Sequence, residues 1–205
     1  MKSIVYTKSY NSPEVNKKEI FRYLGCGEYD AKIDTLADEC IAEVMSLLSY
    51  RACYARYPIM LDGEKIDLGF TSVNSHSLGI CLEGCDEIIL FCATIGSSID
   101  RLIEKYSITS PSRAVMLQAI GSERVESLCD ELCREIAEVE KANGRVTRPR
   151  FSPGYGDLAL EVQSEVFASL EPSAKIGVSL NENLFMRPTK SVSAIIGIKS
   201  ARLLE

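Results

Sequence analysis

The feature that most limits how this chain can fold is the segment 86–95, DEIILFCATI, which is almost continuously apolar and rich in β-branched residues. Such a run predicts a buried strand, because strands covered on both faces lose the alternation of polar and apolar side chains. Helical and strand patterns are mixed along the rest of the chain without strict β–α–β alternation. We therefore expect an α+β fold, a single domain over residues 1–205 whose mostly antiparallel sheet is flanked by helices.

Other segments carry apolar spacings or end signals that are typical of helices. The longest expected helix runs from Ser110-Pro111 to Asn143-Gly144, an ending suited to a left-handed cap. The remaining helices are expected from Ser12-Pro13 to Gly25 or Gly27, over 30–53, onward from Gly96-Ser97-Ser98, and over 158–170 with Asp157 as the cap.

Further strands are predicted by short apolar or alternating runs. They are expected at 3–7, as two short strands within 55–70 around the turn Asp62-Gly63, at 175–181 and at 190–199. The stretch 148–157, RPRFSPGYGD, is dense in proline, glycine and arginine. We therefore expect it to be a loop.

Composition narrows the class of function. The 205 residues are 46% hydrophobic and 25% charged, as in an ordinary globular protein, and the formal net charge is -6. An acidic chain gives no electrostatic reason to expect nucleic acid or an anionic membrane as a partner. The first ten residues lack the apolar core of a signal peptide, and no apolar run reaches the roughly 18 residues needed to cross a bilayer. We expect a cytoplasmic protein.

The eight cysteines and the single histidine bear on metal and nucleophile chemistry. Cys129 and Cys133 share one helix face, and Cys81 and Cys85 have the same spacing, but a complete four-ligand pattern is missing. We favour core packing of thiols over a metal or iron–sulfur site. His76 alone cannot build a histidine-rich metal site, and the chain has no G-x-S-x-G elbow, dinucleotide fingerprint or phosphate loop.

The stretch Arg150–Asp157 is the most informative for binding. Arginine offers a planar fork of donors that fits a carboxylate, and Pro153-Gly154 makes a turn in which backbone groups can approach a ligand. Tyr155 supplies an aromatic face with a polar tip. Together these groups suit an amino acid attached to a flat ring system. On composition alone, a structural turn with a surface arginine is the more frequent outcome.

Two other segments are candidates with the same ambiguity. Glu126, on the longest expected helix, suits an ammonium group, although it is one of several glutamates there and most such residues are solvated. The run 180–193, LNENLFMRPTKSVS, places small hydroxyl residues that either line a groove or decorate an exposed sheet face.

In combination these elements resemble a known family. The R-x-x-P-G-Y pattern at Arg150–Tyr155 is similar to the S-adenosylmethionine-binding motif in the reactivation domain of cobalamin-dependent methionine synthase. It is followed by L-x-E-x-x-x-M-x-P-x-x-S-V-S, found here from Leu180 to Ser193. The helix with Val125-Glu126-Ser127-Leu128 resembles the family's helix that bears a ligand-binding glutamate. The resemblance is strongest over 115–196.

The resemblance implies roles for five residues. Arg150 would grip the carboxylate of the methionine moiety and Glu126 would pair with its amino group. Ser152 and Gly154 would offer backbone contacts, and Tyr155 would contact the nucleoside. It implies no catalytic residue and no metal ligand in this chain.

The resemblance also implies a function: a stand-alone reactivation component that binds S-adenosylmethionine for reductive methylation of cob(II)alamin. The cobalamin would be carried by a methionine synthase subunit, and a flavodoxin-like protein would donate the electron. The chain would then be a component of a methyltransferase system rather than an independent enzyme. The alternatives are a module that keeps the fold without S-adenosylmethionine binding, or a reactivator of a different corrinoid methyltransferase. The module without S-adenosylmethionine binding is favoured by one observation: Ile195–Ile198 stands where the family has paired tyrosines.

Overall fold

The structure is a computed structural model that describes residues 3–25, 30–63 and 65–200. Its main sheet has five strands, and every neighbouring pair is antiparallel. In spatial order the strands are β1 (Tyr6–Ser9), β2 (Arg51–Pro58), β6 (Glu87–Thr94), β10 (Ser191–Ser200) and β7 (Arg145–Phe151). The continuously apolar segment is thus the central strand of an antiparallel sheet.

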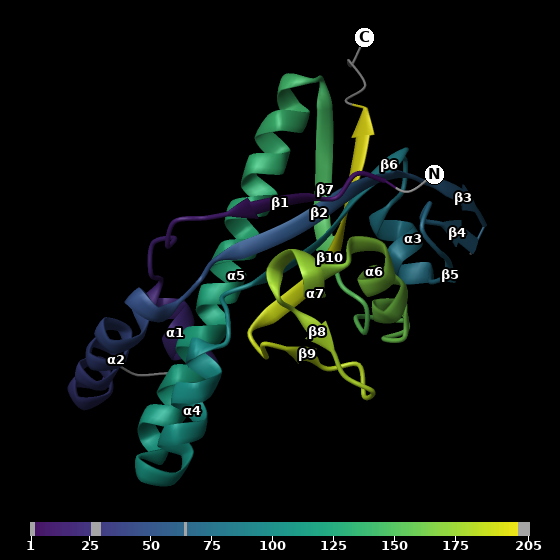
Figure 1. Ribbon diagram of the computed structural model, residues 1–205. Coiled ribbons are helices and arrows are strands. Elements are labelled where there is room, and N and C mark those ends of the chain that lie inside the picture. The colour runs from purple at the N-terminus through teal and green to yellow at the C-terminus, as the bar shows by residue number, and fades with distance from the viewer. Residues whose placement is uncertain (1–2, 26–29, 64, 201–205) are drawn as a thin grey trace.

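Helices cover both faces of this sheet, as Figure 1 shows. The face that carries Ile89, Phe91 and Ala93 of β6 packs against one group of helices, and the face that carries Ile88 and Leu90 packs against the other. This explains the unbroken apolar run, because successive side chains of a strand point to opposite faces and both faces are buried. The first group is α1 (Lys17–Leu24), α2 (Ala31–Val44), α4 (Ser98–Thr109) and α5 (Pro111–Ala142); the second is α3 (His76–Cys81), α6 (Val162–Leu170) and α7 (Pro172–Ile176).

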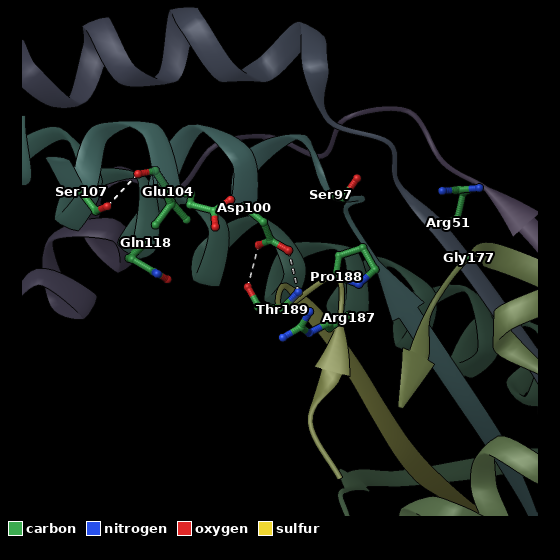
Figure 2. Close-up of a pocket in the computed structure, with 11 residues that line it drawn as sticks. Arg51, Ser97, Asp100, Glu104, Ser107, Gln118, Gly177, Arg187, Pro188 and Thr189 are labelled. Atoms are coloured by element: carbon green, nitrogen blue, oxygen red, sulfur yellow. Dashed lines mark hydrogen bonds between the residues drawn. The ribbon is translucent and has the colours of Figure 1, made fainter. Parts of the chain in front are cut away.

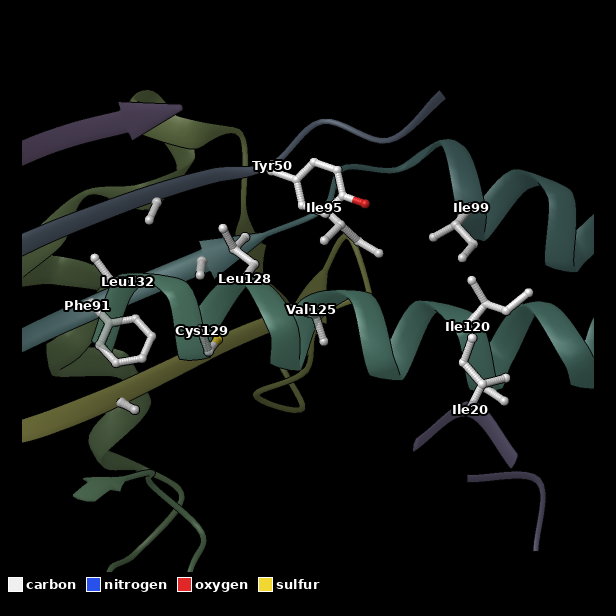
Figure 3. Close-up of a cluster of buried hydrophobic side chains, with 14 of the residues drawn as sticks. Ile20, Tyr50, Phe91, Ile95, Ile99, Ile120, Val125, Leu128, Cys129 and Leu132 are labelled. Atoms are coloured by element: carbon white, nitrogen blue, oxygen red, sulfur yellow. The ribbon is translucent and has the colours of Figure 1, made fainter. Parts of the chain in front are cut away.

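The long helix α5 is the main support of the first face. It begins with Pro111 in its first turn and ends at the cap Asn143, with Gly144 at φ +69°. Its buried side chains meet the sheet and the neighbouring helices in one continuous cluster (Figure 3). The expected helix over this segment is therefore confirmed at both ends, by the proline and glycine signals that the sequence carries.

The other helices of this face differ from expectation at their ends. The first helix begins at Lys17 with Asn16 as its cap, rather than at Ser12-Pro13, and it ends at Gly25. Gly27, the other predicted end, lies outside the described residues. The second helix starts after the cap Asp30 as expected but ends at Val44.

The expected extension of the second helix to residue 53 is wrong. A short 3-10 turn, η1 (Met45–Leu47), follows it, and β2 begins at Arg51. The apolar helical spacing stops at Leu48. Beyond it, pairing of β2 with β6 satisfies the backbone and overrides local helix propensity.

The predicted loop 148–157 is also partly wrong, since its first four residues, Arg148–Phe151, belong to β7. Proline is tolerated there because β7 is an edge strand of the main sheet, so the missing N–H does not interrupt a second ladder. Residues 175–181 are not one strand. They hold the end of α7 and the short strand β8 (Ser179–Leu180), which pairs with β9 (Met186–Arg187).

A small second sheet contains the predicted hairpin. Strands β3 (Met60–Asp62) and β4 (Lys65–Asp67) turn at Gly63, whose φ is +62°, and β5 (Ser72–Asn74) pairs with β4. The strand β5 and the helix α3 were not predicted.

The cysteines that the structure describes are free thiols, and most are buried. Cys53 and Cys92 lie in the core beneath the sheet, and burial raises the pKa of the Cys53 thiol to about 11. Cys26 lies outside the described residues. Within them, no group of three or more histidine, cysteine or acidic side chains could hold a metal ion, and no helix is long and apolar enough to cross a bilayer.

Candidate functional site

Arg150 lies near the end of the edge strand β7, which packs beside α5. Its guanidinium reaches the helix: Nη2 lies 2.5 Å from Oε2 of Glu126, and Nη1 lies 2.5 Å from Oδ1 of Asp130. Glu126 and Asp130 are four residues apart and so share one face of the helix. The structure thus brings together two of the predicted binding residues, although they meet each other as an ion pair.

The contacts of Arg150 with these two carboxylates stabilise its charged form. Burial on its own would lower the pKa of the Arg150 guanidinium, but the hydrogen bond to Asp130 and the charge of Glu126 outweigh it and raise the pKa. One guanidinium thus faces two carboxylates. A ligand carboxylate would have to displace Glu126 or Asp130 from Arg150, whereas a ligand cation would find a carboxylate close at hand.

This cluster forms one wall of a groove of about 220 Å³ between α1, α5 and β7. The groove has more acidic than basic side chains. Its lining residues are Asn16, Glu19, Arg22, Tyr23, Glu123, Glu126, Ser127, Asp130 and Arg150. The α1 residues were not predicted, because only the tertiary fold shows that the start of the chain returns to α5. The spacing of Asp130 from Glu126 is the one sequence signal that would have found a missed residue.

A buried ion pair holds the start of the chain against α5. The Arg124 side chain is 0% exposed and donates to the carbonyl oxygens of Pro13 and Glu14, at 2.6 Å each. The same guanidinium pairs with Glu123, whose Oε1 accepts a hydrogen bond from the backbone N–H of Asn16. Because Asn16 is the cap of α1, this network sets where α1 begins and therefore where the groove has its second wall.

The turn after β7 carries the other predicted residues. The N–H of Gly154 donates to the carbonyl of Leu158 at 2.9 Å, and the N–H of Tyr155 donates to that of Ser152 at 3.1 Å. Gly154 has a φ of +83°, and a Cβ there would lie 3.1 Å from Cδ1 of Leu160. Glycine is therefore needed for the shape of the turn itself.

Tyr155 stands apart from the Arg150 cluster. The residue is 70% exposed, and its ring packs edge-to-face on Phe151, with the centroids 5.4 Å apart. Phe151 belongs to the core beneath the sheet, whereas Arg150 points to α5. The five predicted residues therefore divide into two groups at the end of β7: Glu126 and Arg150 in the groove, and Ser152, Gly154 and Tyr155 on the turn beyond it.

We expected Asp157 to cap the helix that follows it, but it does not. Its carboxylate accepts hydrogen bonds from Oγ of Ser75 at 2.6 Å and from the backbone N–H groups of His76 and Ser77. It thereby joins the turn to the start of α3, and α6 begins only at Val162. These hydrogen bonds hold the pKa of Asp157 well below its usual range.

The run 180–193 contributes to a second and larger cavity, of about 670 Å³, shown in Figure 2. Thr189 lines this cavity, but Ser191 and Ser193 are buried: Ser191 donates to the carbonyl of Pro188, and Ser193 donates to Oε1 of Gln163. Neither prediction for these serines, a groove lining or an exposed face, is correct. The cavity is lined by Arg51, Ser97, Asp100, Ile103, Glu104, Ser107, Gln118, Gly177, Arg187, Pro188 and Thr189.

Comparison with known proteins identifies the fold. No protein-family model matches the chain, and no curated protein matches its sequence. Among solved structures, the fold is similar to that of the MetH reactivation domain bound to AdoHcy. The TM-score is 0.70 at 15% sequence identity, and the match covers 96% of this chain and 78% of that one. The α+β fold with a mostly antiparallel sheet, expected from the sequence, is confirmed.

Proposed function

We propose that this chain is a stand-alone reactivation component that binds S-adenosylmethionine and presents it to a cobalamin carried by a partner protein. The observation that carries the proposal is the meeting of Glu126 and Arg150 in one groove of a fold that it shares with the MetH reactivation domain, which binds AdoHcy. An amino acid needs one cation and one anion to hold its two ends, and these two side chains supply them.

The surplus of carboxylates in the groove supports the sulfonium form of the ligand. S-Adenosylmethionine carries an ammonium and a sulfonium group against one carboxylate, so its net charge is positive. Glu126 and Asp130 share the single guanidinium of Arg150, which leaves one of their two charges uncompensated; Glu19 and Glu123 in the same lining are paired with Arg22 and Arg124. We expect this cationic ligand to be held more tightly than its thioether product, a zwitterion of zero net charge, because opposite charges attract across a partly desolvated site.

The size of the groove limits what it encloses. A volume of about 220 Å³ is below the roughly 300–1,000 Å³ of pockets that enclose a whole drug-sized ligand. The methionine end would occupy the groove, and the nucleoside would extend past the end of β7, where Tyr155 offers an exposed ring. The protein's contribution would be to orient the sulfonium methyl toward the partner's cobalamin.

In that role the partner's cobalamin supplies the methyl acceptor: the methyl group goes to reduced cobalt, and the C–S electron pair stays on sulfur. A flavodoxin-like protein would supply the electron that cob(II)alamin needs first. Methionine synthase is the partner we favour, and another corrinoid methyltransferase would pose the same chemical task.

The competing function is a structural module that has the fold without the ligand. The observation that favours it is that both terminal nitrogens of Arg150 are already paired with carboxylates, as in an ion pair that only joins β7 to α5. The two functions differ in what happens when Arg150 is removed. A binding residue affects affinity, and a purely structural one affects stability alone.

Calorimetric titration with S-adenosylmethionine distinguishes them. We expect saturable binding that Arg150→Ala weakens by about 1.5–3 kcal/mol, the cost of losing a charge-assisted hydrogen bond. Arg134→Ala is the matched control, because Arg134 also lies between two carboxylates of α5, Glu131 and Glu138, but outside the groove. Equal affinity in both variants would remove Arg150 from the site.

The reactivation role needs a separate assay with the partner. A methionine synthase subunit loaded with cob(II)alamin would be mixed with a flavodoxin-like reductant, S-adenosylmethionine and this chain. We expect methylcobalamin to form only when the chain is present, and to form more slowly with Arg150→Ala. Binding of S-adenosylmethionine without any effect on the cobalamin spectrum would contradict the reactivation role while leaving the binding site in place.

A further inference from the structure

The larger cavity has a feature that the groove lacks, namely unpaired cations. Arg51 and Arg187 both line it, and within the described residues neither side chain donates a hydrogen bond or forms an ion pair. Every other arginine that the structure describes donates at least one side-chain hydrogen bond. The two unpaired guanidiniums of the described chain therefore face one and the same cavity.

The acidic groups of the cavity form no ion pair with these arginines among the described residues. Asp100 uses both carboxylate oxygens on Thr189: Oδ2 accepts from the backbone N–H at 2.8 Å and Oδ1 accepts from the hydroxyl at 2.6 Å. Glu104 is exposed, and in Figure 2 it lies with Gln118 at the end of the cavity opposite Arg51. The cavity thus has Arg51 at one end, Arg187 in the middle beside Thr189, and a carboxylate and an amide at the other end.

Further donors lie between these two ends. The hydroxyl of Ser97 accepts a hydrogen bond from Arg101 at 3.1 Å, so its own proton is available to a ligand. Ser97 immediately precedes α4, which has no side-chain cap, and the first N–H groups of a helix have no partner within it. Lys190 is not part of the lining, but its ammonium donates to the carbonyl of Gln118, a lining residue, at 3.0 Å.

We propose that this cavity is a binding site for a small phosphorylated molecule of about nucleotide size, with its phosphate bound by Arg51 and Arg187, the two unpaired guanidiniums of the lining. Guanidinium forks match the geometry of phosphate oxygens, and a phosphate can accept from several donors at once. The volume of about 670 Å³ is in the range of small-molecule pockets, and it is far more than a lone phosphate fills. Glu104 and Gln118 would accept hydrogen bonds from amino or hydroxyl groups at the far end of the ligand.

This site is separate from the proposed S-adenosylmethionine groove. Its lining comes from β2, α4 and the residue before it, the first half of α5, the cap of α7, and β9 with its connection to β10, and it shares no lining residue with the groove. The proposal therefore does not depend on the function proposed above.

The test is an NMR titration of the full chain with adenosine 5′-monophosphate, inorganic phosphate and adenosine as separate probes. We expect the two phosphate probes to shift the backbone amides of Ser97, Gly177 and Thr189 saturably, and adenosine to shift them much more weakly. Arg187→Ala, which changes an exposed side chain, should weaken binding of adenosine 5′-monophosphate about tenfold or more, the change that loss of a charge-assisted hydrogen bond produces.

Two further variants keep the result interpretable. Arg51→Lys keeps the charge but removes the fork of a half-buried side chain, and it should also weaken binding. Arg150→Ala should leave binding of adenosine 5′-monophosphate unchanged, which shows that the probe is not in the groove. The proposal is overturned if neither phosphate probe binds at millimolar concentration, if adenosine binds as well as its monophosphate, or if Arg187→Ala binds as tightly as the original chain.

Discussion

At the scale of single residues, the charges with the largest effect on the stability of the fold are the buried ones. Arg124 and Glu123 are both buried, and together they bind the backbone of residues 13–16 to α5. Removing one member of such a pair leaves the other as an unpaired charge in a poorly solvated place. Surface pairs such as Arg134 with Glu131 lack this property, because water solvates whichever partner remains.

Glu123→Gln is therefore expected to lower the free energy of unfolding by about 3–5 kcal/mol, since Arg124 keeps its charge and loses its counter-ion. Glu131→Gln serves as the control and should cost less than about 1 kcal/mol. Urea denaturation followed by circular dichroism measures both values. A loss for Glu123→Gln as small as that of the control would mean that water enters to solvate Arg124.

Asp157 gives a prediction with a definite pH window. Hydrogen bonds from Ser75, His76 and Ser77 lower its pKa in the folded chain. A carboxylate whose pKa is depressed by folding stabilises the fold above its unfolded pKa, about 3.9, and this contribution disappears as the pH falls through the folded pKa. The original chain should therefore exceed Asp157→Ala in stability by a constant amount above about pH 5.

Below about pH 3.9 that difference should shrink as the pH is lowered. Chemical denaturation of both proteins from pH 7 down to the acid limit of the fold would show it. A difference that stays constant across the acid range would mean that Asp157 acts through its shape and not through its charge.

At the scale of elements, glycines show where packing leaves no room. A Cβ on Gly197 of β10 would lie 2.8 Å from both Sγ of Cys85 and Cδ2 of Leu82, whereas one on Gly79 of α3 would come no closer than 3.8 Å to any neighbour. We expect Gly197→Ala to destabilise the fold by about 1–3 kcal/mol through overpacking. Gly79→Ala should stabilise it by about 0.5–1 kcal/mol, because alanine is the better helix former.

Thermal unfolding of the two variants and of the original chain tests whether the two substitutions change stability in opposite directions. If Gly197→Ala were neutral, the segment 82–85 after α3 would be able to move away from β10, and the contact of Leu82 and Cys85 with β10 would not fix the position of either.

The elements that could be predicted from the sequence are those whose signals are local. The helix α5 carries proline at its start and Asn143-Gly144 at its end, and β6 is apolar on both faces. The secondary-structure predictions failed where contacts between distant parts of the chain determine which element forms. Pro149 indicated a loop, but it belongs to an edge strand whose other partner position is empty. The start of β2 continued a helical segment in sequence, yet its pairing with β6 makes it a strand.

The same division holds for the candidate sites. Glu126 and Arg150 were predicted because their chemistry suits an amino acid, and the fold brings them together. The α1 wall of the groove and the whole of the second cavity were not predicted. Arg51 and Arg187 come from β2 and β9, which are far apart in the chain, so no spacing in the sequence indicates that they share a cavity.

At the scale of the whole molecule, α5 connects the two candidate sites to the core. The residue Gln118 lines the larger cavity, the segment 123–130 lines the groove, and the buried face of the same helix packs on the sheet. The sites therefore rest on the most extensively packed helix of the fold. The small sheet of β3, β4 and β5 contributes to neither, and its strands are mostly exposed.

This arrangement predicts an uneven distribution of local stability, which native-state hydrogen exchange measures. Amides of β6 and β10 should exchange only through global unfolding, because both strands are paired on two sides and covered on both faces. Amides of β3–β5 should exchange through local opening at a much lower free energy, because Ile66 is the one fully buried side chain among those strands. Equal protection in the two sheets would contradict this and would mean that the small sheet unfolds only with the core. In that case, substitutions in β3–β5 would lower global stability as much as substitutions of the core residues that pack against α5.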